Sequence, residues 1–135
     1  MKPTLIQVKD VMKSQVDFVD GMKTVSEALH EMKHVETKTL IVNKRHEYDE
    51  WGVVVVSDIA RKVLAVDKSP DRTNVYEVMT KPAVTVHQDM DIRYCARLFE
   101  ELGLSRAPVV EGKQIIGIIS YTDMVLKGLC ATIKK

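Results

Sequence analysis

A short pattern of an apolar strand followed by a carboxylate occurs twice in the sequence, and this repeat constrains the fold more than any other feature. Gly117 opens an apolar run that leads to Ser120 and then to Asp123, six positions after the glycine. Gly52 opens a similar run, again with an aspartate, Asp58, six positions later. An apolar strand that stops there places a hydroxyl and a carboxylate where a strand passes into a helix. Such a junction suits a ribose or a phosphate, because the carboxylate accepts from sugar hydroxyls and the hydroxyl donates to sugar or phosphate oxygens. Two junctions favour a ligand-binding module over a catalyst.

Further segments recur at a nearly constant distance along the chain. The matching pairs are 9–12 with 76–79 and 24–28 with 91–95, both at a shift of 67 positions, and 39–42 with 107–110 at a shift of 68. The two glycine strands match at 65. We interpret the drift as one residue gained before the middle strand of copy two and three lost in the hairpin that follows. Insertions and deletions confined to loops are typical of a structural repeat.

The first long helix of each copy is marked by its cap and by its apolar spacing. Thr24 with Glu27 three positions later forms a capping box, and Asp91 is the expected cap in copy two. Gly103 fits the left-handed position that ends a helix. Apolar residues at helical spacing predict one buried face in each copy. These residues are Val25, Ala28, Leu29, Met32 and Val35 in copy one, and Ile92, Cys95, Ala96, Phe99 and Leu102 in copy two.

Two strands follow each of these helices. We expect a tight turn at 111–113 to join them in copy two and a longer polar loop at 43–50 in copy one. A final helix starts after Ser57 or Thr122, and each hydroxyl is placed to cap it. With a short strand before each first helix, every copy reads as strand, helix, strand, strand, helix. The sequence therefore predicts an α/β chain of the α+β type.

Length and charge exclude several classes of protein. The 135 residues fit one domain, or two small halves that share a core. Charged residues make up 29% but nearly cancel, leaving a net charge of +1, whereas a nucleic-acid binder needs a basic face. No apolar run approaches the roughly 18 residues that span a membrane. The two cysteines are too few for a disulfide scaffold. We therefore expect a cytoplasmic protein with no nucleic-acid or membrane partner.

With these features the chain resembles a tandem pair of cystathionine-beta-synthase (CBS) domains, a Bateman module, of the small stand-alone prokaryotic type. The resemblance runs from about Val8 to Leu129. It is carried by the Val-Met pair that opens each copy, by the segment 105–110, and by the Gly-x-x-Ser-x-x-Asp pattern after it. The resemblance implies two β-α-β-β-α CBS repeats, 1–67 and 68–135, packed sheet to sheet about a pseudo-twofold axis.

The resemblance also implies a function. CBS pairs bind adenosine-containing ligands, such as AMP, ADP, ATP, S-adenosylmethionine or an NAD-class dinucleotide, in two clefts between the copies, and they signal by altered packing. The aspartate after the last strand would bind the ribose diol, since a carboxylate accepts two hydroxyl donors at once. The hydroxyl three residues earlier would donate to ribose or phosphate. The resemblance further implies a homodimer and a regulated protein that the sequence does not identify. No cofactor is required and no metal is expected.

The site residues are carried over position by position. One cleft would combine Ser120, Tyr121, Thr122 and Asp123 with a wall from copy one made of Val16, Thr37, Lys38 and Thr39. The other would combine Asp58 with Val84, Thr85, Ser105, Arg106 and Ala107, and Arg61, Lys62 and Arg106 would meet a phosphate. The copy-one wall departs from the family pattern, since Leu40 replaces the usual proline and the glycine that ends the helix is missing. At the second cleft Val55 replaces a serine or threonine, so one hydroxyl contact is lost. Two weakened sites, or one working and one silent, both fit these departures.

Simpler roles stay open for the same residues. An aspartate in the first turn of a helix is favourable through the helix dipole alone. Ser120 would also serve as an ordinary strand-end hydroxyl, and Arg106 as a solvated charge. The alternative function is a ligand-free dimerisation or protein-interaction module. We expect no enzymatic activity, because the sequence holds no nucleophile–base set, Walker loop or dinucleotide fingerprint.

Two histidine-containing groups call for comment as metal ligands. The loop 46–50 contains a histidine and three carboxylates but no partner pair at zinc spacing, so a solvated hairpin tip is expected. His30 and His34 lie one helical turn apart without a third ligand, and we expect surface histidines. Cys95 lies on the apolar helix face and is expected in the core. Trp51 is expected to anchor the loop before its strand.

Overall fold

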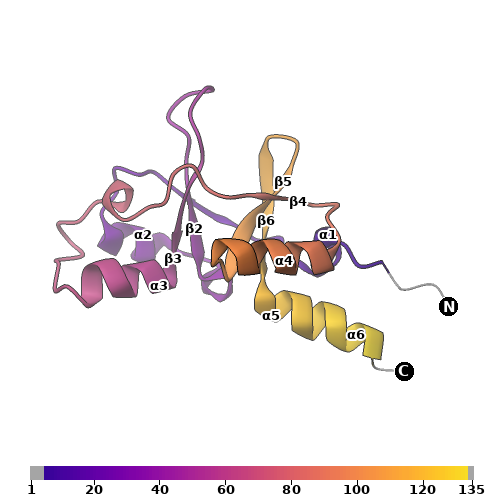
Figure 1. The fold of residues 1–135 in the computed structure, drawn as a ribbon. Helices are drawn as coiled ribbons and strands as arrows, with labels where there is room; N and C mark the ends of the chain where they lie inside the picture. The colour runs from indigo at the N-terminus through magenta and orange to yellow at the C-terminus, as the bar shows by residue number, and fades with distance from the viewer. Residues whose placement is uncertain (1–4, 134–135) are drawn as a thin grey trace. The chain divides into compact units, whose positions relative to one another are not determined.

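The structure is a computed structural model that describes residues 5–133. The chain folds into two compact units. The central unit is Val16–Ala83. The C-terminal unit combines the N-terminal segment, up to Gln15, with the chain from Val84 onward (Figure 1). The opening segment of each sequence copy thus lies with the sheet of the other copy. The predicted repeat limits, 1–67 and 68–135, describe the sequence and do not coincide with this division in space.

The C-terminal unit is a three-stranded sheet covered by helices. Its elements are α1 (Val8–Val11), β4 (Val86–His87), α4 (Ile92–Leu102), β5 (Arg106–Glu111), β6 (Gln114–Ser120), α5 (Tyr121–Asp123), a π-helical stretch (Met124–Leu129) and α6 (Cys130–Ile133). The strand order is β4-β5-β6, with β4 parallel to β5 and β5 antiparallel to β6. Gly112, at φ +61°, makes the tight turn that the sequence predicts between β5 and β6.

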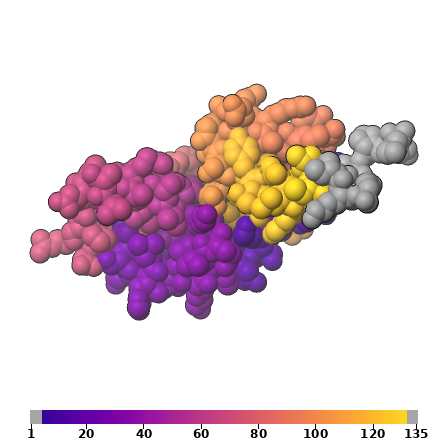
Figure 2. Space-filling model, turned by 90° about the horizontal axis from the view of Figure 1, so that it is seen from below, coloured from indigo at the N-terminus to yellow at the C-terminus, as the bar shows by residue number. Residues whose placement is uncertain are grey.

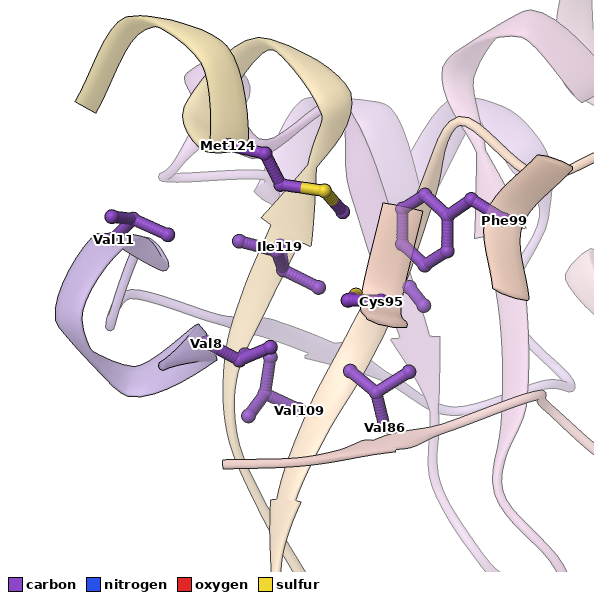
Figure 3. Close-up of a cluster of buried hydrophobic side chains, with 9 residues drawn as sticks. Val8, Val11, Val86, Cys95, Phe99, Val109, Ile119 and Met124 are labelled. Atoms are coloured by element: carbon purple, nitrogen blue, oxygen red, sulfur yellow. The ribbon is translucent and has the colours of Figure 1, made fainter. Parts of the chain in front are cut away.

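The core of this unit includes side chains from α1, α4, the sheet and the final helix. Figure 3 shows these side chains pointing toward one another: Val8, Val11, Val86, Cys95, Phe99, Val109, Ile119 and Met124. Backbone hydrogen bonds hold the N-terminal segment in place, from Val8 N–H to Met90 O at 2.8 Å and from Ile92 N–H to Ile6 O at 2.9 Å. Cys95 is fully buried, which confirms its predicted place in the core, and this burial raises the pKa of its thiol to about 11.

The central unit repeats this architecture. Its elements are β1 (Asp17–Val19), α2 (Val25–Glu31), a 3-10 turn (Val35–Thr37), β2 (Thr39–Val42), β3 (Gly52–Val55), α3 (Val56–Ile59), a π-helical stretch (Ala60–Leu64) and a second 3-10 turn (Val75–Glu77). The strand order is β1-β2-β3, with β1 parallel to β2 and β2 antiparallel to β3. Its core residues are Val19, Val25, Ala28, Leu40, Val42, Val54, Val63, Val75 and Val78.

Strand register corrects the alignment of the two copies. Val42 lies opposite Val19 and Gly52, and Val109 lies opposite Val86 and Gly117. Val42 and Val109 are therefore equivalent at a shift of 67, and the predicted shift of 68 was wrong. No residue is gained before the middle strand, and the hairpin of copy two is shorter by two residues rather than three. Ile41, not Leu40, occupies the position of Pro108. The error arose because the matched segments of both strands are mostly apolar, so hydropathy alone matches either register.

The helix caps were predicted well at the first helix of each copy and wrongly at the last. Thr24 and Glu27 form the capping box, the Asp91 side chain accepts from Arg93 N–H, and Gly103 ends α4 at φ +67°. The final helices do not begin after Ser57 and Thr122. Their N-caps are the last residues of the preceding strands, which are Val55 and Ser120. Each strand passes into its helix without a loop, so the helix starts earlier than the hydroxyls predict.

The first helix of copy one is shorter than its apolar spacing predicts. Helix α2 ends at Glu31, and Val35 lies in the following 3-10 turn with 65% of its surface exposed. Val25 and Ala28 are buried, whereas Leu29 is exposed. No helix within residues 5–133 is both long and apolar enough to cross a bilayer.

Candidate ligand-binding site

Ser120 and Asp123 form a buried polar pair where β6 passes into α5; we call the segment 120–123 the Asp123 junction. The Ser120 hydroxyl accepts from Asp123 N–H at 3.2 Å and donates to Asp123 Oδ2 at 3.0 Å. Both residues are 3% exposed. A serine at this position satisfies a free N–H of the first helical turn and fixes the carboxylate rotamer at the same time.

Two lysines surround the carboxylate of Asp123. Lys13 Nζ donates to Asp123 Oδ1 at 2.7 Å, and Lys127 Nζ lies 3.6 Å from the same oxygen. The side chain of Lys13 is 25% exposed and that of Lys127 is 50% exposed. Both oxygens of Asp123 therefore have partners inside the unit, Lys13 on Oδ1 and Ser120 on Oδ2.

Lys13 is held at the junction by its main chain. Its N–H donates to Ile118 O, and its carbonyl accepts from Ile118 N–H, both at 2.9 Å. Gly117 allows this close approach, because a Cβ there would lie 2.6 Å from Lys13 O and 2.6 Å from Met12 Sδ. The sequence analysis missed Lys13 as a site residue. It lies 110 positions from Asp123, and no local signal indicates that the N-terminal segment packs on β6.

The equivalent junction of the central unit, segment 55–58, has different chemistry; we call it the Asp58 junction. Asp58 Oδ2 accepts from Val55 N–H at 3.4 Å, and Oδ1 pairs with the guanidinium of Arg61. The Asp58 side chain is 13% exposed and that of Arg61 is 66% exposed. As predicted, Val55 supplies no hydroxyl. Thr80 stands where the other junction has Lys13, since Thr80 and Val53 exchange backbone hydrogen bonds at 2.9 and 2.8 Å.

The predicted site residues divide between the two units. The C-terminal unit holds Val84, Thr85, Ser105, Arg106 and Ala107 together with Ser120, Tyr121, Thr122 and Asp123. The central unit holds Val16, Thr37, Lys38 and Thr39 together with Asp58. The combination of residues from both copies in one cleft therefore stays a prediction.

Several residues of the C-terminal set adjoin the Asp123 junction. Arg106 lies opposite Ser120 in the β5–β6 ladder, and cross-strand partners share a face of the sheet. The carbonyl of Ser105 accepts from Tyr121 N–H at 3.0 Å. The ring of Tyr121 instead packs edge-on against Phe99, with ring centres 5.3 Å apart, and burial raises the pKa of its phenol. Val84 and Thr122 are exposed, Thr85 is partly exposed, and Ala107 is buried.

The polar residues of the copy-one wall mainly stabilise their own turn. Thr37 Oγ1 donates to His34 O at 2.9 Å, and Thr39 Oγ1 donates to Thr37 O at 2.9 Å. Both threonines are 1% exposed. Lys38 ends the 3-10 turn before β2 in the left-handed conformation, at φ +55°. Val16, just before β1, is partly exposed.

A pocket of about 820 Å³ opens at the other end of β2. It is lined by Asp20, Gly21, Met22, Val42, Asn43, Lys44, Arg45, Tyr76, Met79 and Lys81. Asp49 binds Lys81 Nζ at 2.8 Å and Arg45 Nε at 3.1 Å, and the hydrogen bond from Lys81 holds the pKa of Asp49 well below its usual range. Asp49 thus pairs with two of the cations that line this pocket, as Asp123 does with two lysines at its own junction.

Trp51, which is expected to anchor the loop before its strand, contacts an aromatic ring and a lysine. The ring centres of Trp51 and Phe18, which lies in β1, are 5.7 Å apart. Lys44 Nζ lies 5.3 Å from the centre of the Trp51 ring. Across the described part of the chain, no group of three or more metal-binding side chains comes together.

Comparison with known proteins identifies the family. The CBS domain family model matches residues 75–128. The hexameric CBS-CP12 protein from bloom-forming cyanobacteria is 38% identical and superposes with a TM-score of 0.89, over 98% of this chain and 74% of that one. The chain belongs to the CBS domain family. The resemblance to CBS domains and the α+β fold class, both predicted from the sequence, are confirmed.

Other similar proteins show how far the likeness reaches. MK0525 from Methanopyrus kandleri is 28% identical over 122 residues, which cover 89% of this chain and 61% of that protein. The CBS domain pair of protein MJ0100, solved in complex with 5′-methylthioadenosine and S-adenosyl-L-methionine, is 23% identical, with a TM-score of 0.77 over 97% of this chain and 100% of that one. At that identity the likeness shows the shared fold.

Proposed function

We propose that this CBS chain is a regulatory module that binds an adenosine-containing ligand and signals through a change in packing. The observation that carries the proposal is the buried Ser120–Asp123 pair at the end of an apolar strand, with Lys13 beside it. A buried carboxylate fixed by a serine is a pre-organised acceptor for a sugar diol. Adenosyl ligands on the CBS pair of MJ0100 support this ligand class. The copy-one wall of Val16 and Thr37–Thr39 stays part of the proposal.

Calorimetric titration with AMP, ATP, S-adenosylmethionine and NAD tests this function. The intact chain should bind at least one of the four saturably. Asp123→Asn removes the charge but keeps the shape of the side chain, so binding at the Asp123 junction should be lost. Asp58→Asn is the matched change at the other junction and should leave that binding intact. Binding that survives Asp123→Asn and fails in Asp58→Asn would move the site to the Asp58 junction.

A second function, ligand-free association with itself or with a partner protein, is favoured by one specific observation. The final helix leaves Val125, Leu126 and Leu129 exposed at 45%, 62% and 53%, and in Figure 2 this yellow helix lies at the surface. The similar CBS-CP12 protein is hexameric. We propose a homodimer, a regulated partner protein and no catalytic activity. Sedimentation that shows only 15.3 kDa species at micromolar protein would contradict the dimer.

The two functions are distinguished by stability. A ligand that binds only the folded state raises the melting temperature, and the rise grows with the logarithm of the ligand concentration above its Kd. A thermal shift with any of the four compounds therefore supports the sensor function. The absence of a shift with all four, together with self-association, would favour the interaction module.

A further inference from the structure

The two lysines beside Asp123 together carry more positive charge than its single carboxylate balances. Two ammonium groups, those of Lys13 and Lys127, lie 2.7 and 3.6 Å from one oxygen of a single carboxylate. Two positive charges against one negative charge leave an excess of one. The Asp123 carboxylate is 3% exposed and the Lys13 side chain 25%, so water screens the charge of Lys13 less than that of the half-exposed Lys127.

We propose that Lys13 makes the Asp123 junction selective for adenosine compounds that carry a phosphate on the ribose, over uncharged adenosine and over sulfonium compounds such as S-adenosylmethionine. This inference rests on the proposed function, because it assumes that the ribose diol meets Asp123. It adds the charge of the ligand, which neither the family nor the Ser120–Asp123 pair determines.

The hydrogen-bond inventory supports the proposal. A carboxylate has about four acceptor positions, and at Asp123 one is taken by Lys13 on Oδ1 and one by Ser120 on Oδ2. A ribose diol would use the remaining acceptor capacity and would draw the carboxylate's charge away from Lys13. The ammonium has three donors, one of which points to Asp123. A phosphate beside the ribose would supply both acceptors and negative charge, whereas a sulfonium would add a second positive charge.

Lys13 does not need to be recruited to this position. Paired backbone hydrogen bonds hold Lys13 opposite Ile118, which lies two residues before Ser120 in β6. A charge held in place before the ligand arrives costs less to order on binding than a free surface lysine does. The Asp58 junction has neutral Thr80 at the equivalent position, so the selectivity belongs to one junction.

Titration of the intact chain and of Lys13→Thr with adenosine, AMP and S-adenosylmethionine tests the proposal. The substitution installs the residue that the Asp58 junction has. The intact chain should bind AMP at least about tenfold more tightly than adenosine, the range expected for a hydrogen bond to a charged group. In Lys13→Thr that ratio should fall about tenfold, chiefly through weaker AMP binding. Binding of S-adenosylmethionine should be unchanged or tighter.

Two matched variants control the result. Lys9→Thr removes a lysine of the same segment whose partner is the exposed Asp89, and it should leave every affinity unchanged. Lys13→Arg keeps the charge and should keep the preference for AMP. Should Lys13→Thr fail to fold, the intact chain still tests the proposal, because added salt must weaken AMP binding more than adenosine binding.

Each outcome has one meaning. Equal affinities for adenosine and AMP in the intact chain, or an AMP preference that Lys13→Thr leaves unchanged, would overturn the role of Lys13 while leaving adenosine binding in place. Binding of none of the three compounds, and of neither ATP nor NAD, would overturn the proposed function and this inference together.

Discussion

At both junctions a strand passes directly into a helix with an aspartate in its first turn, yet the two aspartates have different surroundings. Asp123 is 3% exposed and is held by Lys13 and Ser120, whereas Asp58 is 13% exposed and pairs with a solvated Arg61. The backbone pairing is the same in both, including the bridge to Lys13 or Thr80. Two side-chain differences, Ser120 in place of Val55 and Lys13 in place of Thr80, therefore give the Asp123 junction a buried polar network that the Asp58 junction lacks.

The largest expected effect comes from closing the space that Gly117 leaves. Gly117→Ala should destabilise the fold by about 3 kcal/mol, since the new Cβ would lie 2.6 Å from the backbone oxygen of Lys13. Gly52→Ala should cost about 1 kcal/mol, because its nearest contact is the flexible Met79 Sδ at 2.8 Å. Urea denaturation of both variants measures the difference. Equal costs would mean that the two bridges are equally tolerant and would weaken the comparison.

Removing Lys13 should have the next largest effect. Lys13→Met keeps the bulk of the side chain and leaves the Asp123 carboxylate without its closest partner, at a cost of about 2 kcal/mol. The cost is below that of a fully buried pair because Lys127 remains 3.6 Å away. A double-mutant cycle with Asp123→Asn should recover most of this energy as coupling. A coupling near zero would show that the pair is not formed in solution.

Loss of the Ser120 hydroxyl is expected to cost less. Ser120→Ala removes the helix cap and one hydrogen bond to Asp123, which should destabilise the fold by about 1–2 kcal/mol. The reciprocal change, Val55→Ser, should be nearly neutral, because a gain of about 1 kcal/mol from the cap offsets a similar loss of apolar burial. Thermal unfolding of both variants makes the measurement. A large loss in Val55→Ser would show that burial of Val55, and not the missing cap, dominates the Asp58 junction.

The smallest effect is expected at the surface pair. Arg61→Ala should change stability by about 0.5 kcal/mol or less, since the Arg61 side chain is 66% exposed and such pairs are screened by water and salt. Denaturation at low and high salt provides the measurement, and Lys13→Met under the same conditions is the comparison. An Arg61→Ala cost as large as that of Lys13→Met would remove the distinction between the two junctions.

Much of the fold was accessible from the sequence because its signals are local. The capping box at Thr24, the cap at Asp91, the left-handed Gly103 and the tight turn at Gly112 each depend on residues a few positions apart. Hydrophobic spacing along one helix likewise placed Cys95 in the core. Local hydrogen bonds and backbone preferences act in the same way wherever the segment lies in the fold.

Of the candidate site, the sequence by itself determined the repeat, the Ser120–Asp123 pair and the missing hydroxyl at Val55. Only the tertiary structure decided that the N-terminal segment lies with the sheet of the second copy and brings Lys13 to Asp123 across 110 positions. It also decided that the final helices start at the ends of their strands, before Ser57 and Thr122. These features depend on strand register and on contacts between distant segments. No local preference encodes them, because they form only when the apolar faces of separate elements are buried together.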